Sequence, residues 1–326
     1  MDINILDIQP SVINKSLSGK TLLLAGEPKI GKSEFCAQSK RTLICDLENG
    51  YNARPGVLKV KVTKWSELKL IVRQLNTPEA HEKYDNVAID TINVAWDLCT
   101  KHICQCNGVQ SINDIPYGAG YKMRDDEFDL TLRQIIMMNY GLILTCHTKE
   151  KLISSDEQHG DVYSIEPNVD KRCLPLINAM VDIIGIINQT WTPDGKSQRW
   201  LITKPTPTVK AGSRWEYLPH KIPFGYDYLE KAIGDALDKQ VENGEKVVDT
   251  VENNYSIGPD YTSLMIEARA LWDKLVGEDD SGDNLNKILK KIEIIFGRKI
   301  RISEITEDQV DQLELVIQEM RNMANV

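Results

Sequence analysis

The first 190 residues alternate between short apolar runs and longer segments whose apolar positions repeat at helical spacing. Short runs of this kind are typical of buried strands, and they cover residues 21–26, 42–45, 86–90 and 141–147. The helical pattern occupies residues 65–75, 92–106 and 126–139, and a further helix is expected to begin at Lys32. Strands that alternate with helices favour a mostly parallel sheet with helices on both faces, so the predicted fold class is α/β.

The pattern changes after residue 180. Two apolar runs, residues 181–188 and 199–204, flank a Pro-Asp-Gly turn signal at residues 193–195, which predicts a β-hairpin. Residues 240–260 are polar and acidic and contain Gly and Pro, so we interpret them as a linker. The α/β domain is therefore predicted to cover residues 1–239.

A second, helical domain is predicted at residues 261–326. Three stripes of apolar residues at helical spacing indicate a small bundle, and Thr306 with Gln309 forms a capping-box pattern before the last helix. Within this domain, residues 287–301 hold six basic residues and one acid. Such a segment could contact nucleic-acid phosphates, and it could equally be the solvated face of a helix.

Composition narrows the class of protein. The chain has 326 residues, of which 41% are hydrophobic and 27% charged, as in an ordinary globular protein. A net charge of −9 excludes a uniformly basic surface for nucleic acid but leaves room for a local basic groove. No run approaches the ~20 apolar residues of a membrane span, and the N-terminus lacks a secretory pattern. We therefore expect a cytoplasmic protein, in the host cytoplasm if a phage encodes it, with no membrane partner.

One cluster of possible metal ligands can be explained either as a zinc site or as ordinary side chains of a helix. Cys99, His102, Cys104 and Cys106 lie close together, which allows a zinc site. Their segment has a helical pattern, however, and the spacing is not that of paired C-x-x-C knuckles. Reduced thiols on a helix are the favoured interpretation.

The strongest chemical signal is a phosphate-binding loop. Residues 26–33 read GEPKIGKS, which fits the pattern G-x-x-x-x-G-K-S between a predicted strand and a predicted helix. Its glycines let backbone amides turn toward phosphate oxygens, Lys32 is expected to reach the β- and γ-phosphates, and the Ser33 hydroxyl is expected to bind Mg²⁺. The residues expected to contact ATP are Gly26, Glu27, Pro28, Lys29, Ile30, Gly31, Lys32, Ser33 and Glu34.

Three polar residues lie at the carboxyl ends of predicted strands, where α/β sheets bind ligands. Asp90 is the expected second Mg²⁺ ligand, with a helix cap as the alternative. Because Thr91 rather than Glu follows Asp90, the base that deprotonates water must come from elsewhere, and Glu48 is the best candidate. A solvated turn carboxylate is the alternative for Glu48. His147 is either a sensor of the γ-phosphate or a structural histidine.

The order of five segments resembles a known family. GEPKIGKS, CDLENG, AIDT, DIPYGAGYKMRDDEF and ILTCHTKEK follow one another as in the bacteriophage RecA-like ATPases that accompany single-strand annealing and recombination functions. The resemblance covers roughly residues 15–225, and it implies a RecA-like core in which Glu48 is the catalytic carboxylate, Asp90 the magnesium ligand and His147 the γ-phosphate sensor. The long N-terminal helix that polymerises full recombinases is not evident, and His147 replaces the glutamine usual in RecA itself.

The resemblance also implies DNA contacts and assembly. Residues 107–124 and 151–172 occupy the positions of the family's two DNA-facing loops. Because the second segment is acidic in its middle, its basic edge is better suited to DNA: Lys149, Lys151, Lys171 and Arg172. In the first segment, three residues are suited to bases and phosphates, although the tyrosines could instead be core residues: Tyr117, Tyr121 and Lys122. Lys210 and Arg214 resemble a basic pair that reaches the nucleotide of the next subunit in a homo-oligomer, with a solvated loop as the alternative.

The leading hypothesis is a DNA-dependent ATPase of phage recombination. It would bind ATP and Mg²⁺, engage single-stranded DNA, and assist a single-strand-binding or annealing protein. Three alternatives stay open: an ATP-gated adaptor that recruits partners through the helical domain, a small-molecule P-loop kinase, and a helicase motor. The kinase is disfavoured because no arginine-rich lid or acceptor-site motif is found in the sequence.

Overall fold

The computed structural model describes residues 13–156, 160–242, 247–248, 261–277, 282–306 and 309–324. The chain divides into two compact units, Met1–Tyr255 and Ser256–Val326. Of the predicted linker, residues 240–242 belong to a helix and residues 247–248 form a short strand, β13 (Val247–Val248), parallel to β1 (Ile13–Asn14). The rest of the linker lies outside the described residues.

One sheet organises the larger unit. Its strands are, in chain order, β2 (Thr21–Ala25), β3 (Thr42–Asp46), β4 (Lys59–Lys61), β5 (Asn86–Asp90), β6 (Gly141–Cys146), β9 (Ile183–Trp191), β10 (Ser197–Ile202), β11 (Gly212–Ser213) and β12 (Lys221–Pro223). Their order across the sheet is β12-β10-β9-β2-β6-β5-β3-β4, and β11 pairs with β9. The strands from β9 to β4 are parallel, whereas β10, β11 and β12 pair antiparallel with their neighbours. The predicted mostly parallel sheet and its β9–β10 hairpin are confirmed.

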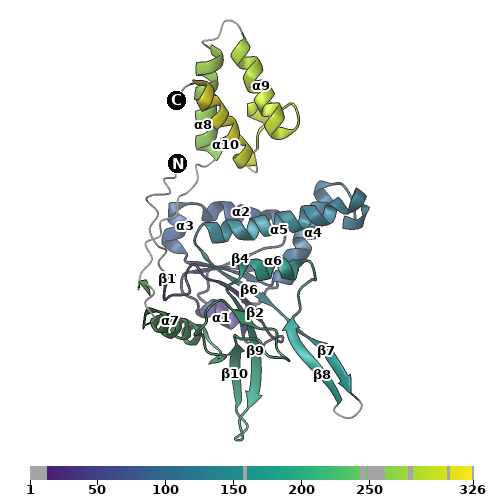
Figure 1. Cartoon of the computed structure of the whole chain (residues 1–326), viewed down its shortest axis with the longest axis vertical. Helices are drawn as coiled ribbons and strands as arrows, with labels where there is room; N and C mark the ends of the chain where they lie inside the picture. The colour runs from purple at the N-terminus through teal and green to yellow at the C-terminus, as the bar shows by residue number, and fades with distance from the viewer. Residues whose placement is uncertain are drawn as a thin grey trace. The chain divides into compact units, whose positions relative to one another are not determined.

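Helices cover both faces of this sheet (Figure 1). They are α1 (Lys32–Gln38), α2 (Trp65–Leu75), α3 (Pro78–Lys83), α4 (Ile92–Cys106), α5 (Ala119–Met137), α6 (Cys173–Met180) and α7 (Tyr226–Glu242). Alternate strand residues enter different cores: Leu23 packs on the side of α2, α4, α5 and α6, and Leu22 on the side of α1 and α7. Trp65 and Phe128 stack at 5.6 Å in the first core, and Phe35 and Phe224 at 5.7 Å in the second.

The two segments expected to be loops contain regular structure. The first includes two short 3₁₀ turns, Ile112–Asp114 and Pro116–Gly118, and the beginning of α5, which starts seven residues before the helix predicted at 126–139. The second forms a hairpin of β7 (Thr148–Asp156) and β8 (Gly160–Pro167), whose tip lies outside the described residues.

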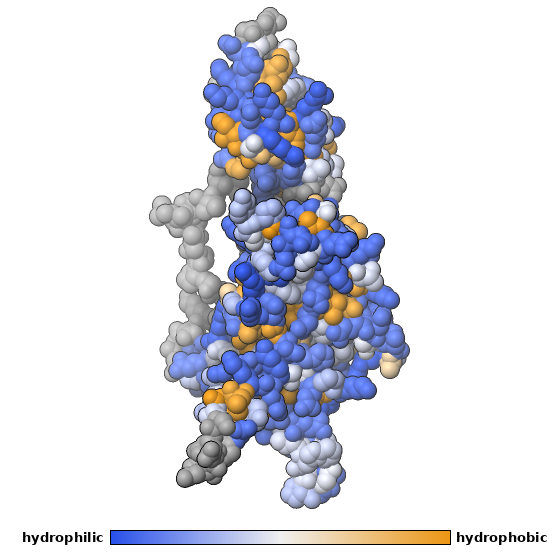
Figure 2. Space-filling model, turned by 90° about the vertical axis from the view of Figure 1, so that its right-hand side faces the viewer, coloured by the Kyte–Doolittle hydropathy of each residue, from blue (hydrophilic) through white to orange (hydrophobic). Residues whose placement is uncertain are grey.

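Contacts distant in sequence hold the β7–β8 hairpin. The Ile165 amide donates to the Thr208 carbonyl at 2.8 Å, and the Lys210 amide donates to the Ile165 carbonyl at 2.9 Å. The hairpin projects from the core (Figure 1). Both of its strands carry large exposed side chains: Leu152, Ile153, Val162 and Tyr163. Figure 2 shows hydrophobic patches on this face of the molecule.

The smaller unit is a helical bundle, as the sequence predicts. It consists of α8 (Tyr261–Gly277), α9 (Asp283–Phe296), a 3₁₀ turn at Ile302–Glu304, and α10 (Val310–Ala324). Its core contains side chains from all three helices, such as Leu264, Ile288 and Leu313. The Thr306 amide donates to Gln309 Oε1 at 3.1 Å, which is one half of the predicted capping box. None of the helices in the described part of the chain has the length and apolar character needed to cross a membrane.

Candidate functional site

The phosphate-loop pattern lies between β2 and α1, as predicted. At its end Gly31 has a φ of 115°, a conformation that L side chains rarely adopt. A β-carbon on Gly31 would also lie 2.2 Å from the Arg199 guanidinium nitrogen Nη1. Glycine is therefore required at this position. Residues 27–29 are exposed at the crest of the loop, and Ile30 anchors it in the core.

Lys32 points back into the loop. Its ammonium donates to the carbonyl oxygens of Gly26 at 2.8 Å and Glu27 at 2.9 Å, and it lies 3.4 Å from His147 Nδ1. Burial lowers the pKa of Lys32, and the nearby Asp90 charge opposes this shift. The loop therefore holds a cation enclosed by backbone oxygens, beside a histidine from the end of β6.

Ser33 and Asp90 lie in direct contact. Ser33 Oγ donates to Asp90 Oδ2 at 2.7 Å, and the hydroxyl of buried Thr145 donates to Asp90 Oδ1. The cap of α4 is Thr91, so the Asp90 side chain contacts the phosphate loop and β6 instead of serving as a helix cap. The structure thus brings the two predicted magnesium ligands together.

The space around these two oxygen groups suits a small cation. Mg²⁺ prefers oxygen ligands and is bound by one or two protein groups together with phosphates and water. A β-carbon on Gly50 would lie 3.2 Å from Ser33 Oγ and 3.6 Å from Asp90 Oδ2, so this glycine keeps the adjacent space open. The donor set and the open space both fit Mg²⁺.

Glu48 is exposed near this group, and its position is fixed by the strand that carries Asp90. Thr91 Oγ1 donates to Glu48 Oε1 at 2.6 Å, and the Leu47 amide donates to the Asp90 carbonyl at 2.9 Å. In the sequence, Thr91 was informative only because it is not a glutamate. In the structure it orients the carboxylate that is the candidate base.

Several residues that contact the site were not identified from the sequence. Arg199, on β10, donates from Nη1 to the Ile30 carbonyl at 2.9 Å and to Glu34 Oε2 at 3.2 Å. Arg54 forms an ion pair with the same Glu34 oxygen at 3.7 Å. Tyr51 is buried in the core beside α1, and burial, together with Cys36 and Asp90 nearby, raises the pKa of its hydroxyl. Thr145 could have been noticed in the sequence, because it is a polar residue inside an apolar strand.

Lys210 and Arg214 lie apart from the phosphate loop and its Lys32 side chain. Arg214 Nη1 is 3.0 Å from Asp182 Oδ1, and its Nη2 donates to the Ala179 carbonyl at 3.1 Å. The Lys210 side chain is exposed near the base of the β7–β8 hairpin, where its amide pairs with Ile165. Their predicted contact with a neighbouring subunit stays a prediction.

Aromatic and basic side chains from the two predicted DNA-facing segments form a stack with Trp96 of α4. The guanidinium of Arg124 lies 3.9 Å from the centre of the Trp96 ring and 5.4 Å from that of Tyr121. The Arg172 guanidinium also lies over the Tyr121 ring, 4.7 Å from its centre. Asp125 binds both arginines, Arg124 at 2.8 Å and Arg172 at 3.1 Å. We call Trp96, Arg124, Tyr121 and Arg172 the cation–π stack.

A short hydrogen-bond path leads from His147, beside Lys32, toward the cation–π stack. The Asn168 amide donates to the His147 carbonyl at 2.7 Å, and Asn93 Nδ2 donates to the Asn168 carbonyl at 2.7 Å. Asn93 and Asn168 adjoin a polar cavity of about 260 Å³ that Asn93, Trp96 and Arg124 line. The path therefore leads from His147 to a cavity whose wall includes two members of the cation–π stack.

The four candidate zinc ligands all lie on α4. Cys99 and Cys104 are buried in α4, whereas Cys106 is exposed with its Sγ 3.6 Å from His102 Nε2. Across the residues that the structure describes, no three His, Cys, Asp or Glu side chains are grouped to hold a metal ion. The three thiols thus lie on one helix, as the sequence pattern predicts.

The parallel sheet, the phosphate loop and the Ser33–Asp90 pair together define a P-loop nucleoside triphosphatase. Residues 18–215 match the family described as AAA domain, and the chain belongs to that family. The chain is also 27% identical over 336 aligned positions to the SPbeta prophage-derived uncharacterized protein YorG of Bacillus subtilis (strain 168), with 99% of each chain covered. The name of this relative indicates a prophage origin and no activity.

Proposed function

We propose that this protein is a DNA-stimulated ATPase with a RecA-like core that acts in phage DNA recombination or single-strand annealing. The observation that carries the proposal is the path from Lys32 and His147 through Asn168 to Asn93, which lines the same cavity as Trp96 and Arg124 of the cation–π stack. It connects a site suited to a nucleoside triphosphate with basic and aromatic side chains, of which Arg172 is exposed and Tyr121 half-buried. The prophage origin of the relative and the order of the sequence motifs support the phage context.

In this proposal different residues of the chain bind the phosphates, hold the metal ion and accept the proton. The Gly26–Ser33 amides surround the phosphates, and Lys32 exchanges its carbonyl partners for β- and γ-phosphate oxygens. Ser33 and Asp90 would hold Mg²⁺, which would supply positive charge beside the phosphates. Glu48, oriented by Thr91, accepts a proton from the attacking water.

His147 would connect the nucleotide to DNA. It lies 3.4 Å from the Lys32 ammonium and ends the strand that leads into the β7–β8 hairpin. Stacking on aromatic rings and pairing with basic groups are the usual means of binding single-stranded DNA without sequence preference. Tyr121 and Arg172 offer both, and Lys122 and Lys171 adjoin them in the sequence.

ATP hydrolysis measured with and without single-stranded DNA tests the proposal. We expect DNA to raise the rate, and we expect the stimulation to fall as salt rises because phosphate contacts release counterions. A rate that ignores DNA at every salt concentration would contradict the DNA part of the proposal. The molecular mass measured in the same samples tests the homo-oligomer, and added single-strand-binding or annealing protein tests the expected partners.

Arg172→Ala and Tyr121→Ala should reduce the response to DNA while leaving basal hydrolysis unchanged. Loss of one stacking side chain costs about 1–3 kcal/mol per base, so we expect roughly tenfold weaker single-stranded DNA binding. Fluorescence anisotropy of a labelled oligonucleotide measures this change. Arg133→Ala is the matched control, because Arg133 lies on α5, the helix of Tyr121, and forms a partly exposed pair with Asp129. Equal losses in variant and control would argue against the stack as the DNA contact.

Arg199→Ala should weaken ATP binding by less than tenfold. Hydrogen bonds to charged groups contribute about 1.5–3 kcal/mol, but solvent screens the exposed guanidinium, so we expect about 1 kcal/mol, or roughly fivefold. The physical reason is that Arg199 fixes the Ile30 carbonyl and Glu34 at the end of the loop. Titration with ATP measures the effect, and Lys196→Ala, on the exposed turn before β10, is the control. An unchanged affinity for ATP in Arg199→Ala would show that Arg199 does not position the loop for ATP.

A further inference from the structure

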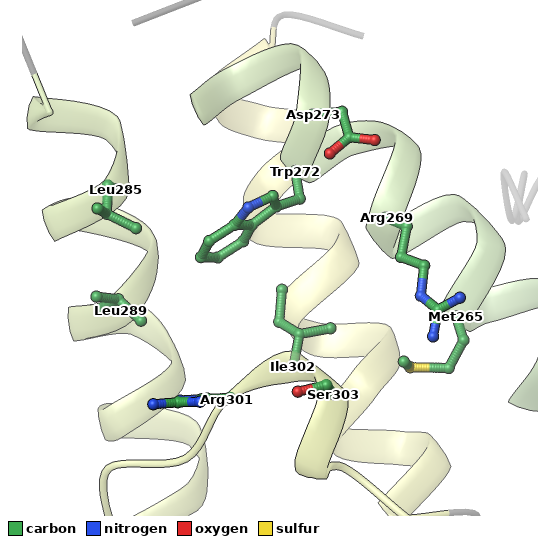
Figure 3. A pocket seen from close by; sticks show the side chains of 9 residues that line it. All are labelled: Met265, Arg269, Trp272, Asp273, Leu285, Leu289, Arg301, Ile302 and Ser303. Carbon is green, nitrogen blue, oxygen red and sulfur yellow. The ribbon is translucent and has the colours of Figure 1, made fainter. Parts of the chain in front are cut away.

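The helical unit contains a cleft that neither the ATP site nor the cation–π stack uses. It has a volume of about 470 Å³ and lies between α8, α9 and the segment around Ile302 (Figure 3). Its walls are mainly apolar, with side chains of Met265, Trp272, Leu285, Leu289 and Ile302. Figure 3 shows the Trp272 indole lying between the two helices, with Leu285 and Leu289 on the α9 side.

This apolar surface is accessible. Leu289 is 40% exposed, although neighbouring Ile288 on the same helix is buried in the core. In Figure 2 the unit shows hydrophobic patches within a largely hydrophilic surface. A concave apolar surface of this size is typical of a site that receives a ligand side chain, because filling it removes apolar area from water.

The edge of the cleft is positively charged. Arg269 on α8 and Arg301 before the 3₁₀ turn both line it and are exposed, and Asp273 is the acid among the lining residues. Within the described part of the chain, neither guanidinium forms an ion pair with a carboxylate. Both remain available to an external anion.

The surroundings strengthen this charge. Residues 287–301 carry six basic residues and one acid in a chain whose net charge is −9. Lys291 of this segment is paired with Glu319 at 2.9 Å. The cleft therefore combines an apolar interior with a cationic border, which is unusual for an acidic protein and complements a ligand that is both apolar and acidic.

We propose that this cleft binds a short acidic segment of a partner protein, with a bulky apolar side chain inside and carboxylates on Arg269 and Arg301. The interior favours a peptide over nucleic acid. Phosphate contacts need only the cations, whereas Met265, Leu285, Leu289 and Ile302 offer aliphatic contacts that suit an apolar side chain. Trp272 is the expected anchor contact. The inference does not depend on ATP hydrolysis or on the cation–π stack.

Fluorescence polarisation with the full-length protein tests this inference. The probes are fluorescein-labelled 12-residue peptides, each with one central Phe, Leu, Ile, Met or Trp flanked by aspartates. Matched peptides carry Ser at the centre or Lys in place of Asp. We expect saturable binding of at least one acidic, apolar-centred peptide, with at least tenfold weaker binding of its two matched controls.

Variants locate the site. Arg269→Glu combined with Arg301→Glu should weaken peptide binding at least tenfold, whereas Lys274→Glu, an exposed residue of α8 outside the cleft, should change it less than twofold. Trp272→Ala should also weaken binding, and the arginine variants cover the case in which the tryptophan variant loses its fold. ATP hydrolysis should be unchanged in all of them.

Two results would overturn the inference. The first is that no peptide of the set binds, or that Lys274→Glu weakens binding as much as the paired arginine variant. The second is that the arginine variant loses binding of a labelled oligothymidine while no acidic peptide binds, since the cleft border would then be a nucleic-acid surface. Either result leaves the proposed ATPase function untouched, which the hydrolysis measurement tests separately.

Discussion

Lys32→Ala will reduce ATP turnover by a factor of about 10²–10³, the loss expected when one preorganised donor to developing charge is removed. The ammonium is already enclosed by the Gly26 and Glu27 carbonyls beside His147, so its position is set before a phosphate arrives. No other lysine or arginine among the described residues donates to these two carbonyls. Steady-state phosphate release measures the effect as kcat/KM.

Lys40→Ala is the control for this experiment. Lys40 follows α1, outside the phosphate loop, and its side chain is exposed. We expect its turnover to stay within about threefold of the wild-type rate, because an exposed charge contributes little in water. Thermal unfolding shows whether both variants keep the fold. If Lys32→Ala retained more than a tenth of the activity, the assignment of the loop would be wrong.

Glu48→Gln will separate hydrolysis from binding. A general base contributes about 10²–10⁴ to the rate, so turnover should fall by that factor while ATP affinity changes little. The amide keeps the shape of the side chain and can still accept the hydrogen bond from Thr91, but it cannot take a proton from water. Single-turnover hydrolysis and a binding titration on the same protein give the two quantities.

Thr91→Val provides an internal check on Glu48. It removes the 2.6 Å hydrogen bond to Glu48 Oε1 and leaves the carboxylate in place. We expect about a fivefold slower turnover, since one positioning hydrogen bond contributes roughly 1 kcal/mol. Unchanged hydrolysis in Glu48→Gln would assign the base elsewhere. Retained biological activity in a Glu48→Gln protein that no longer hydrolyses ATP would favour the ATP-gated adaptor.

Local sequence patterns predicted the parts of the site that local structure determines. The Gly26–Ser33 loop has its conformation because β2, the glycines and α1 are adjacent in the chain. Asp90 could be placed because it ends an apolar strand, and the carboxyl ends of parallel strands meet at one edge. The β9–β10 hairpin likewise followed from its own turn residues.

Other features depend on contacts that a local pattern does not contain. Arg199 reaches the Ile30 carbonyl across 169 residues of sequence, and β7–β8 is held at its base by residues 208–210. Helix α5 begins early despite the glycines of the YGAGY segment, because Gly120 is packed closely: a β-carbon there would lie 2.6 Å from Ile115 Cδ1. Glycine here serves close packing, whereas the sequence alone suggests a loop.

The central claim is that the Gly26–Ser33 loop binds a triphosphate whose Mg²⁺ is held by Ser33 and Asp90. Isothermal titration of the purified protein with a non-hydrolysable ATP analogue, with Mg²⁺ and with EDTA in its place, tests it most directly. We predict saturable binding that weakens at least tenfold in EDTA, and in Asp90→Asn even with Mg²⁺ present. Absence of binding with Mg²⁺, or affinity that is indifferent to both Mg²⁺ and Asp90, would contradict the account.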